Sequence, residues 1–503
     1  MNSIVSLLPL VLFLLVALGI SYFVRSHQTS NQGFLKDYFI GNRALGGFVL
    51  AMTTVATYGS VSSFVGGPGQ AWSIGFGWVY MATVQVTALF LLFGILGKKM
   101  ALISRRIGAI TVIDVLRARF ESNALAVASA IIIVLFFAAT MVAQFVGGAK
   151  LFAAVTGYSY VIGLVLFGIV VILFTTIGGF RGVAITDTLC GIVMLIGIAI
   201  LAGGILHAGG GYTNIIDTIH ATDPDMLTPL DGGNMPLGLY FTQWLLVGVL
   251  TFALPQSVVR TLGFKDTKAL KSALIIGTVV IGAMMIGVTA LGVLSKGVLV
   301  GTLADYGNSV DNIIPLTIVA TMPRWLAAIA IIGPVAASIS TVSSLLIASS
   351  SAIVKDLYLG FASNKGKTVK EGSIASMSRV ITLGIGALVF VLSIAPPSVI
   401  WKINMFAFGG LETAFCWVLL GALFWKRANK YGALLSMVGG TVAYCIAMGL
   451  SFKIGGLHQI VIGISVSLIC MIIGSYIGKP ASKQALAIFF PQLKLANSEQ
   501  ADN

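Results

Sequence analysis

The chain has 503 residues, of which 57% are hydrophobic and only 9% charged, and its formal net charge is +14. A soluble core of this length cannot bury so many apolar side chains, so the composition excludes a soluble globular protein and indicates an all-α polytopic membrane protein. Binding to nucleic acid is not needed to explain the positive charge, because the lysines and arginines lie mainly in short loops that face anionic lipid headgroups.

Thirteen apolar segments come near the length that spans a membrane as a helix. In chain order they are residues 5–23, 45–65, 76–96, 124–149, 160–177, 185–206, 238–255, 273–294, 325–353, 374–394, 403–425, 431–450 and 460–477. The first segment has no basic residue before it and Arg25 directly after it, the reverse of a secretory signal. We therefore expect it to remain as a helix.

The basic residues are distributed unevenly between the two sides of this arrangement. Of the 30 lysines and arginines, 25 fall on one set of alternate loops, and Arg260 is one of these 25. The other side holds Lys150, Lys296, Arg324, Lys402 and Lys453. By the positive-inside rule the protein is expected in the cytoplasmic (inner) membrane, with its N-terminus outside and its C-terminus in the cytoplasm.

Two of the segments carry signals of a broken helix. The stretch from Thr53 to Gln70 is rich in hydroxyls and glycines, and a span that unwinds must line a polar cavity, since hydrocarbon cannot satisfy broken backbone. The seventh segment ends at Pro255, which frees a helical carbonyl and either breaks the helix there or merely terminates it.

The spans also suggest an internal repeat. Without the first helix and the last two, ten spans remain, and they divide into two sets of five at a long acidic loop. Because five is odd, two copies of one fold in series insert with opposite orientations, as in secondary transporters. The expected units are 1–43 (an extra helix and a cytoplasmic loop), 44–207 and 238–425 (the repeats), 208–237 (an external loop), 426–479 (two extra helices) and 480–503 (a cytoplasmic tail).

The external loop carries Asp217, Asp223, Asp225 and Asp231 without a lysine or arginine, and we expect it to be solvated. The tail 497–503 is polar and is expected to be disordered.

A possible cation site combines the second and ninth segments. Ala337 precedes Ser340 and Thr341 by three and four residues, so the three share a helical face. Ala56 and Gly59 are small and three apart, so an unwound turn there turns both carbonyls inward. Hard cations such as Na⁺ prefer oxygen ligands, and these positions offer five without a buried net charge.

Several motifs together resemble one known family. They are Asp-Tyr-Phe-Ile-Gly at 37–41, Ala-Thr-Tyr at 56–58 with Phe-Val-Gly-Gly-Pro-Gly at 64–69, and Gly-Gly-Phe-Arg at 178–181 within 175–187. The others are 337–341, Ile-Val-Lys-Asp-Leu-Tyr at 353–358, Phe-Ala-Phe-Gly-Gly-Leu-Glu at 406–412, and Arg427 with the Gly-Ala pair at 432–433. From residue 37 to about residue 478 the chain resembles the sodium/solute symporters, most closely the sodium/pantothenate symporters.

The resemblance implies a LeuT-like 5+5 inverted-repeat core that imports pantothenate with sodium by alternating access. It implies that the carbonyls of Ala56, Gly59 and Ala337 and the side chains of Ser340 and Thr341 bind the sodium ion. Such a protein is a transporter rather than an enzyme, and we expect a monomer.

Two positions qualify the transfer of functional residues from the family. Proline-transporting relatives have an aspartate where this chain has Tyr58. Any role of that carboxylate in sodium handling therefore cannot be assigned to this chain. Asp187 matches an acidic position linked to sodium exit in relatives, which makes it a candidate for the sodium path. The alternative is an interfacial ion pair with Arg181, which would add little stability.

Pantothenate has a carboxylate, an amide and two hydroxyls. No lysine or arginine is expected deep in a span, so neutral donors and helix N-termini would have to hold the carboxylate. The candidate contacts are Tyr58, Ser62, Ser63, Gln85, Thr251, Gln256, Asn404 and Glu412.

Glu412 is the one carboxylate well inside an apolar segment, which by default suggests function. It accepts hydrogen bonds from the substrate, partners a cation, or sits protonated against a neighbouring helix.

The alternatives are a symporter of the same fold for another small solute, such as a monocarboxylate, proline or sialic acid, a channel, or a membrane sensor. A channel needs a continuous polar pore, whereas the polar residues here concentrate at breaks in a few helices. A sensor of this family would continue into a signalling domain after residue 478. Neither the four histidines nor the four cysteines have the spacing of a metal or nucleophile site.

Overall fold

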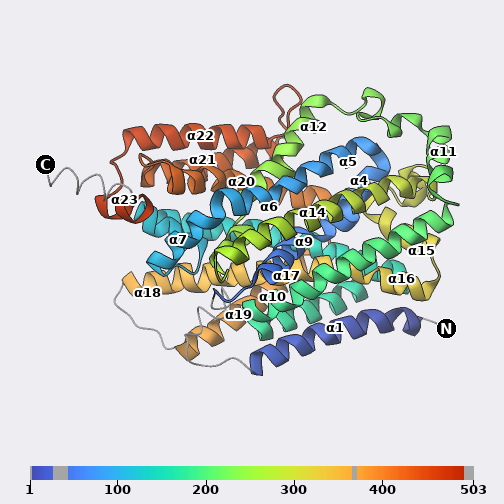
Figure 1. Cartoon of the computed structure of the whole chain (residues 1–503), viewed down its shortest axis with the longest axis horizontal. Coiled ribbons are helices and arrows are strands. Elements are labelled where there is room, and N and C mark those ends of the chain that lie inside the picture. Colours follow the sequence, from blue (N-terminus) through green and yellow to red (C-terminus); the bar gives the residue numbers. More distant parts are fainter. Residues whose placement is uncertain (1–2, 27–42, 365–370, 492–503) are drawn as a thin grey trace.

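The computed structural model describes residues 3–26, 43–364 and 371–491, which form a bundle of long helices that run mainly along one axis (Figure 1). The motif at 37–41 and the tail 497–503 lie outside the described residues.

The first half of the chain contributes one broken helix and several continuous ones. Its elements are α1 (Ser3–Ser26), α3 (Gly47–Tyr58), η3 (Ser62–Gly66), α4 (Gly67–Ile74), α5 (Phe76–Thr83), η4 (Val84–Val86), α6 (Thr87–Leu91), η5 (Leu92–Gly97), α7 (Lys98–Ile107), α8 (Val112–Phe120), α9 (Asn123–Thr156) and α10 (Tyr160–Ala208). Gly179, with φ +57°, divides α10 into two spans, because this left-handed backbone is accessible to glycine at little cost.

The second half begins with the other broken helix. It comprises α12 (Leu237–Trp244), η8 (Leu245–Val249), η9 (Leu250–Ala253), α13 (Pro255–Val258), η10 (Val259–Leu262), α14 (Thr267–Leu294), η11 (Ser295–Gly297), η12 (Leu303–Tyr306), η13 (Val310–Asn312), α15 (Ile313–Thr321), α16 (Arg324–Ala330), α17 (Ile332–Ser351), η14 (Ala352–Leu359), α18 (Gly360–Asn364), α19 (Glu371–Leu392) and α20 (Ile400–Phe424). The chain then forms α21 (Lys430–Gly449), α22 (Ile460–Ile477) and α23 (Lys483–Phe489).

Ten helices of the described residues are long and apolar enough to cross a membrane, and two bent helix pairs raise the number to 12. Together with α1, whose apolar stretch Leu8–Ile20 is shorter, they correspond one to one to the segments expected from the sequence. The protein is therefore a multi-pass membrane protein.

Both expected breaks are present, and each opens one set of five spans. The chain bends by 62° between α3 and the η3–α4 helix. It bends by 41° between η9 and α13, where Leu254 is extended and Pro255 begins the next helix. Pro255 therefore breaks the seventh span rather than ending it, and this span continues to Leu262.

This continuation corrects one sequence-based expectation. Arg260 was assigned to a cytoplasmic loop, but it lies on η10 within the bent span and is 1% exposed. The statement that no arginine lies deep in a span is therefore wrong. The physical reason is that a proline can interrupt a helix without stopping it when neighbouring helices satisfy the freed backbone groups.

The region between the two halves is also more ordered than a simple solvated loop. It forms the helix α11 (Tyr212–Thr222) and the short turns η6 (Pro224–Leu227) and η7 (Asp231–Gly233). Ile215 and Ile219 on α11 are buried, and α11 packs against η11. The isoleucines recur four residues apart on one face, which explains why the segment docks.

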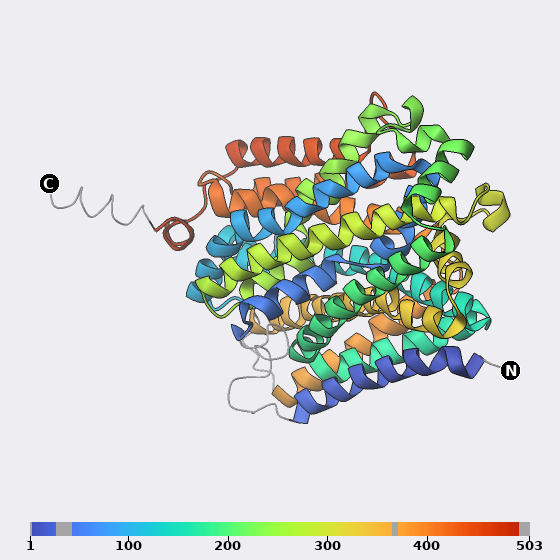
Figure 2. The same cartoon turned by 45° about the vertical axis from the view of Figure 1, so that its right-hand side comes forward.

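The extra helices lie on opposite sides of the bundle. In Figures 1 and 2, α1 runs along one edge while α21 and α22 run along the other. α1 packs mainly against α10, and α21 packs against α22 and α20. The loops at one end carry α11 and α15, and the other end carries α7, α18 and α23 (Figure 1).

The α21–α22 contact depends on close backbone approach. A Cβ atom at Gly474 would lie 2.7 Å from the Cα atom of Gly432. Replacement of Gly474 by leucine should therefore push the helices apart and cost about 1–3 kcal/mol, as overpacking typically does. Thermal unfolding of the purified protein in detergent measures this effect. Gly449→Leu is the matched control, because nothing lies within 4 Å of a Cβ atom there. Equal loss of stability in both variants would contradict the packing argument.

Candidate functional site

The break in α3 lies inside the protein, where its backbone groups find partners. The helix ends at Tyr58, and Gly59 has the extended backbone angles φ −67° and ψ 118°. The N–H of Val61, which the break frees, donates to Oε1 of Gln144 on α9 at 2.9 Å. Gln144 is fully buried, so this side chain replaces a lost helical acceptor at a depth without solvent.

The five oxygens expected from the sequence come together between α3 and α17. The hydroxyl of Ser340 donates to the carbonyls of Ala56 at 2.8 Å and Ala337 at 3.1 Å. The hydroxyl of Thr341 donates to the carbonyls of Ala337 at 2.9 Å and Gly59 at 3.3 Å. The two hydroxyls thus link carbonyls of the broken helix to a carbonyl of α17.

This cluster has the chemistry of a sodium site. All of its members are oxygens, which hard cations prefer, and none carries a formal charge. Both hydroxyls can rotate so that their lone pairs face a cation while the carbonyls already point inward. Ser340 is fully buried and Thr341 is 3% exposed, so a cation here would exchange water for protein oxygens.

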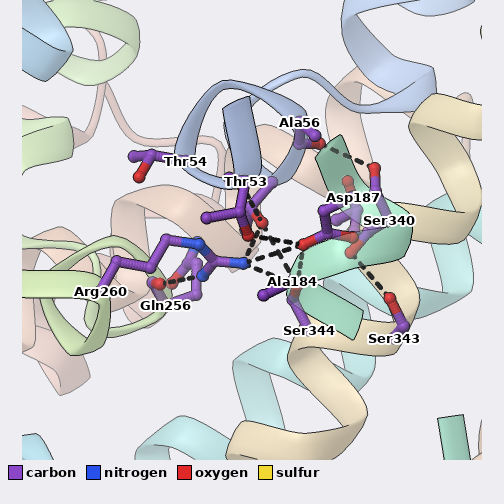
Figure 3. Close-up of polar contacts among 12 residues, drawn as sticks. Thr53, Thr54, Ala56, Ala184, Asp187, Gln256, Arg260, Ser340, Ser343 and Ser344 are labelled. Carbon is purple, nitrogen blue, oxygen red and sulfur yellow. Dashed lines mark hydrogen bonds and ion pairs between the residues drawn. The ribbon is translucent and has the colours of Figure 1, made fainter. Parts of the chain in front are cut away.

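A buried ion pair lies next to this cluster (Figure 3). Nη2 of Arg260 lies 3.4 Å from Oδ2 of Asp187 on α10, and both side chains are almost completely buried. Thr53 on α3 and Ser344 on α17 also donate to Oδ2 of Asp187, at 2.9 and 3.3 Å. A guanidinium and two hydroxyls thus compensate one carboxylate in the interior.

Arg260 connects further elements to the same point. Its Nη1 atom donates to the carbonyl of Gln256 at 2.6 Å, and Nη2 donates to Ser344 Oγ at 2.8 Å and to Thr57 Oγ1. Figure 3 shows the guanidinium reaching from η10 into the space between α3, α10 and α17. Ser344 lies one helical turn from Ser340, and Thr57 directly follows Ala56. The ion pair and the five oxygens therefore share two helices.

The observed partner of Asp187 differs from the expected one. The sequence suggested an ion pair with Arg181 at the membrane interface, but the pair is with Arg260 and Asp187 is fully buried. The side chain of Arg181 lies outside the described part of the chain. Once Pro255 is treated as a break, the position of Arg260 five residues later reveals a basic residue inside the span. Thr53 and Thr57 lie in the hydroxyl-rich stretch that the sequence pattern marked, although no individual role was assigned to them, and nothing in the pattern singled out Gln144.

The substrate candidates form one main group. Tyr58 donates from its hydroxyl to the carbonyl of Val247 at 2.5 Å, and Thr251 donates to the carbonyl of Gly248 at 2.6 Å, so the break of α3 meets the η8–η9 segment. The segments η3, η8 and η9 all pack against α20, which carries Asn404 and Glu412.

Unpaired polar atoms distinguish some members of this group. Ser62 Oγ, Gln256 Oε1, Asn404 Oδ1 and both carboxyl oxygens of Glu412 are buried without a hydrogen-bond partner among the described residues. Buried polar groups normally have partners, so these atoms are candidates for contacts with a ligand or water. Ser63 is only partly buried, and Gln85 lies on η4, which packs against η8 and α14.

A small cavity extends from the ion pair toward the end of the bundle that carries α7 and α18. Its volume is about 40 Å³, enough for a few water molecules. Arg260 and Ser344 line one part of it, and Thr111 and Asp356 line another. Thr111, the N-cap residue of α8, donates to Oδ1 of Asp356 at 2.8 Å and so closes the far side of the cavity.

Comparisons with known proteins agree with this geometry. Residues 38–440 match the model of the sodium:solute symporter family. The chain belongs to the sodium:solute symporter family. It is accordingly a sodium-coupled transporter rather than an enzyme, and sodium is its coupling ion.

Relatives extend the family match over almost the whole chain. It is 40% identical to a sodium/pantothenate symporter of Escherichia coli over 483 residues, covering 94% of this chain and 96% of the relative. A sodium/pantothenate symporter of Haemophilus influenzae is also 40% identical, with the same coverage.

A solved structure supports the fold. A sodium-coupled sialic acid symporter in a substrate-bound outward-open state matches with a TM-score of 0.78 at 20% identity, over 95% of this chain and 98% of that one. The expectation of an all-α membrane protein with a LeuT-like core is confirmed.

The buried ion pair makes a testable contribution to stability. Replacement of Arg260 by alanine leaves Asp187 buried without its cation, which typically costs about 3–5 kcal/mol. The double variant R260Q/D187N replaces both charges with neutral polar groups, so its free energy of unfolding should be closer to that of the wild type. Denaturant titration in mixed micelles measures these free energies. Arg106→Ala is the control, since Arg106 makes an exposed contact with the carbonyl of Ile488. If R260A loses no more stability than the control variant, the ion pair does not contribute to stability as predicted.

Proposed function

We propose that the protein is a sodium-coupled symporter that imports pantothenate by alternating access, with Na⁺ held by Ala56, Gly59, Ala337, Ser340 and Thr341. The observation that carries the proposal is the convergence of these five neutral oxygens at the break of α3. The substrate assignment is supported by the two sodium/pantothenate symporters that are 40% identical to the chain.

The substrate would bind where the two broken helices meet α20. Tyr58, Ser62, Thr251, Gln256, Asn404 and Glu412 contribute to this pocket, with Ser63 and Gln85 at its margin. Because the guanidinium of Arg260 is occupied by Asp187, Thr57 and Ser344, the substrate carboxylate would be held by hydroxyl and amide donors and by helix ends.

Asp187 would lie on the path by which sodium leaves. It lies beside the proposed sodium site, and the adjoining cavity leads from Arg260 toward Asp356. A sodium ion moving this way would leave the five neutral oxygens and reach the hydroxyls of Thr53 and Ser344, which lie beside the carboxylate of Asp187. Each step replaces oxygen ligands with further oxygen ligands, so the ion is not left without coordination.

Coupling follows from the shared elements. Sodium that joins α3 to α17 fixes the break, and the break also carries the proposed substrate contacts Tyr58 and Ser62. Loading one site therefore strengthens the other by the same factor, as linkage requires. Movement of one charge through 100 mV supplies about 2.3 kcal/mol to drive uptake.

The orientation is part of the proposal. The end with α11 and α15 would be external, and the end with α8 and α23 cytoplasmic, in the inner membrane. We further propose a monomer in which spans 44–207 and 238–425 are inverted repeats. A related solute, such as a monocarboxylate, proline or sialic acid, is the alternative substrate.

The sodium site can be tested by removal of its hydroxyls. Ser340→Ala and Thr341→Ala each delete one of five ligands and should weaken the apparent affinity for sodium at least about tenfold, the effect of 1.4 kcal/mol. Sodium-dependent uptake of labelled pantothenate into proteoliposomes measures this, with proline, acetate and sialic acid as competitors.

Ser350→Ala is the matched control, because Ser350 is equally buried on α17 but donates to the carbonyl of Ser378. Unchanged sodium dependence in both site variants would refute the site. If a competitor rather than pantothenate is accumulated, the site stands and the substrate assignment falls.

The orientation predicts distinct labelling patterns. In a variant without the four native cysteines, Asn234→Cys should react with a membrane-impermeant maleimide in intact cells, because this exposed position precedes α12 at the external end. Lys479→Cys, exposed after α22, should react only after the membrane is permeabilised. The reverse pattern would invert the proposed topology.

A further inference from the structure

Four carboxylates are buried within the described residues: Asp187, Asp311, Asp356 and Glu412. Asp187 pairs with Arg260, Asp311 pairs with Lys150 at 3.0 Å, and Asp356 accepts from Thr111. Glu412 differs from the other three. Its side chain is fully buried, and neither Oε1 nor Oε2 has a hydrogen-bond partner in the described part of the chain.

Among the residues that the structure describes, no cation lies near enough to compensate a charge on Glu412. The elements that pack most extensively against α20 are α8, α9, α21, α22, η3, η8 and η9, and Lys99 of α7 and Asp311 of η13 also contact it. The ionisable groups of the elements that pack most extensively and of α20 itself, together with these two residues and Tyr58 on α3, are the following: Tyr58, Lys99, Asp114, Arg117, Arg119, Lys150, Asp311, Lys402, Cys416, Lys430, Tyr431, Tyr444, Cys445, Cys470 and Tyr476.

The cations among them are engaged elsewhere or distant. Lys150 is bound to Asp311, and Arg119 and Lys99 donate to the carbonyls of Ala422 and Leu423, which are ten or more residues from Glu412 on α20. Arg117 donates to the carbonyl of Asp356 on η14, and Lys430 lies over the ring of Tyr431. Lys402 is ten residues from Glu412 on the same helix, about 15 Å along the axis.

The titratable groups that face Glu412 are neutral in their ordinary forms. A charge on Glu412 would act on Tyr58, Cys416 and Tyr444, which lie on α3, α20 and α21. Tyr58 and Tyr444 already donate their hydroxyl hydrogens, to the carbonyls of Val247 and Met405. Neither therefore donates to the carboxyl group in this conformation.

An isolated carboxylate at this position would be very costly, because a buried ion without a partner loses its hydration and gains nothing in return. The neutral acid avoids this cost. It is also the form compatible with an anionic substrate in the neighbouring pocket, since a second negative charge would repel the substrate. Two independent requirements therefore favour a proton on the same group.

We propose that Glu412 is a proton-binding site, and that the bundle closes around the substrate only when this carboxyl group carries a proton. The proton enters or leaves in conformations that admit water to Glu412. The only bond formed is the O–H bond between a carboxylate oxygen and a proton taken from water, and deprotonation returns that proton to water. The inference rests on the proposed transport function, because the closing step it controls is that of the substrate-loaded carrier.

The sign of the pH effect follows directly. As pH rises, more of the open carrier has a charged Glu412 that cannot be enclosed, so uptake falls by about tenfold for each pH unit beyond the point of half-titration. Glu412→Gln, which is permanently neutral and nearly isosteric, should abolish this fall. Glu412→Asp remains titratable and should retain it.

The experiment is uptake of labelled pantothenate into proteoliposomes between acidic and alkaline pH, at a fixed sodium gradient and clamped membrane potential. The measured quantity is the ratio of rates at low and high pH within each variant. Thr413→Val is the matched control, because the neighbouring Thr413 is also fully buried with an unpartnered hydroxyl. A sloping profile in the wild type, T413V and E412D with a flat profile in E412Q supports the proposal.

Two results would overturn it: a wild-type profile that does not fall with pH, or an unchanged fall in E412Q. Absence of pantothenate uptake at every pH refutes the proposed function, which separates the two failures.

A measurement on the wild type covers the case in which E412Q does not fold. In weakly buffered detergent solution at alkaline pH, addition of sodium and pantothenate should draw protons from solution. Binding without proton uptake there would contradict the proposal.

Discussion

The structure depends on one constraint: backbone groups exposed by a broken helix must find partners inside the protein, because lipid offers none. At the break of α3 the N–H of Val61 reaches Gln144, and the carbonyls of Ala56 and Gly59 reach the hydroxyls of α17. The break is thus possible only between α9 and α17. The same requirement that stabilises it gathers carbonyl oxygens at one point, which is the property a sodium site needs.

The neighbouring ion pair extends this electrostatic arrangement. Asp187 and Arg260 cancel in charge, so the region keeps hydrogen-bonding capacity without a net charge that would hold sodium too strongly. A buried pair gives little net stability compared with apolar packing, but its geometry is specific. Here it joins α10 of the first half to η10 of the second, and hydroxyls of α3 and α17 complete it. The two halves therefore meet at a point adjacent to the proposed sodium ligands.

Much of this architecture could be predicted from the sequence. Spans follow from hydropathy, the break of α3 from glycines and hydroxyls, and the five oxygens from small-residue spacing along two helices. The partners that arrive from distant helices could not be predicted. Gln144 is one glutamine in a long apolar helix, and its pairing depends on how α9 packs against the break. Arg260 was misplaced because Pro255 was compatible with either a break or an end, and only the packing around it decides between them.

The contacts at the two ends of the bundle show why such a structure can change conformation. At one end Asp311 binds Lys150 of α9 and accepts from the N–H of Ile400 at the start of α20. At the other, Lys355 on η14 pairs with Asp114 on α8 at 2.8 Å. Each contact links the two halves and includes a partly exposed lysine. Asp114 is partly exposed as well, and an ion pair of this kind contributes only about 0–1 kcal/mol, whereas Asp311 is fully buried. A coupling energy of about 1–3 kcal/mol between ion and substrate exceeds the contribution of the Lys355–Asp114 pair. The contacts between α3 and α17 at the centre of the bundle are buried, whereas the Lys355–Asp114 pair at the end that carries α18 is partly exposed, so this end can open while the central contacts persist.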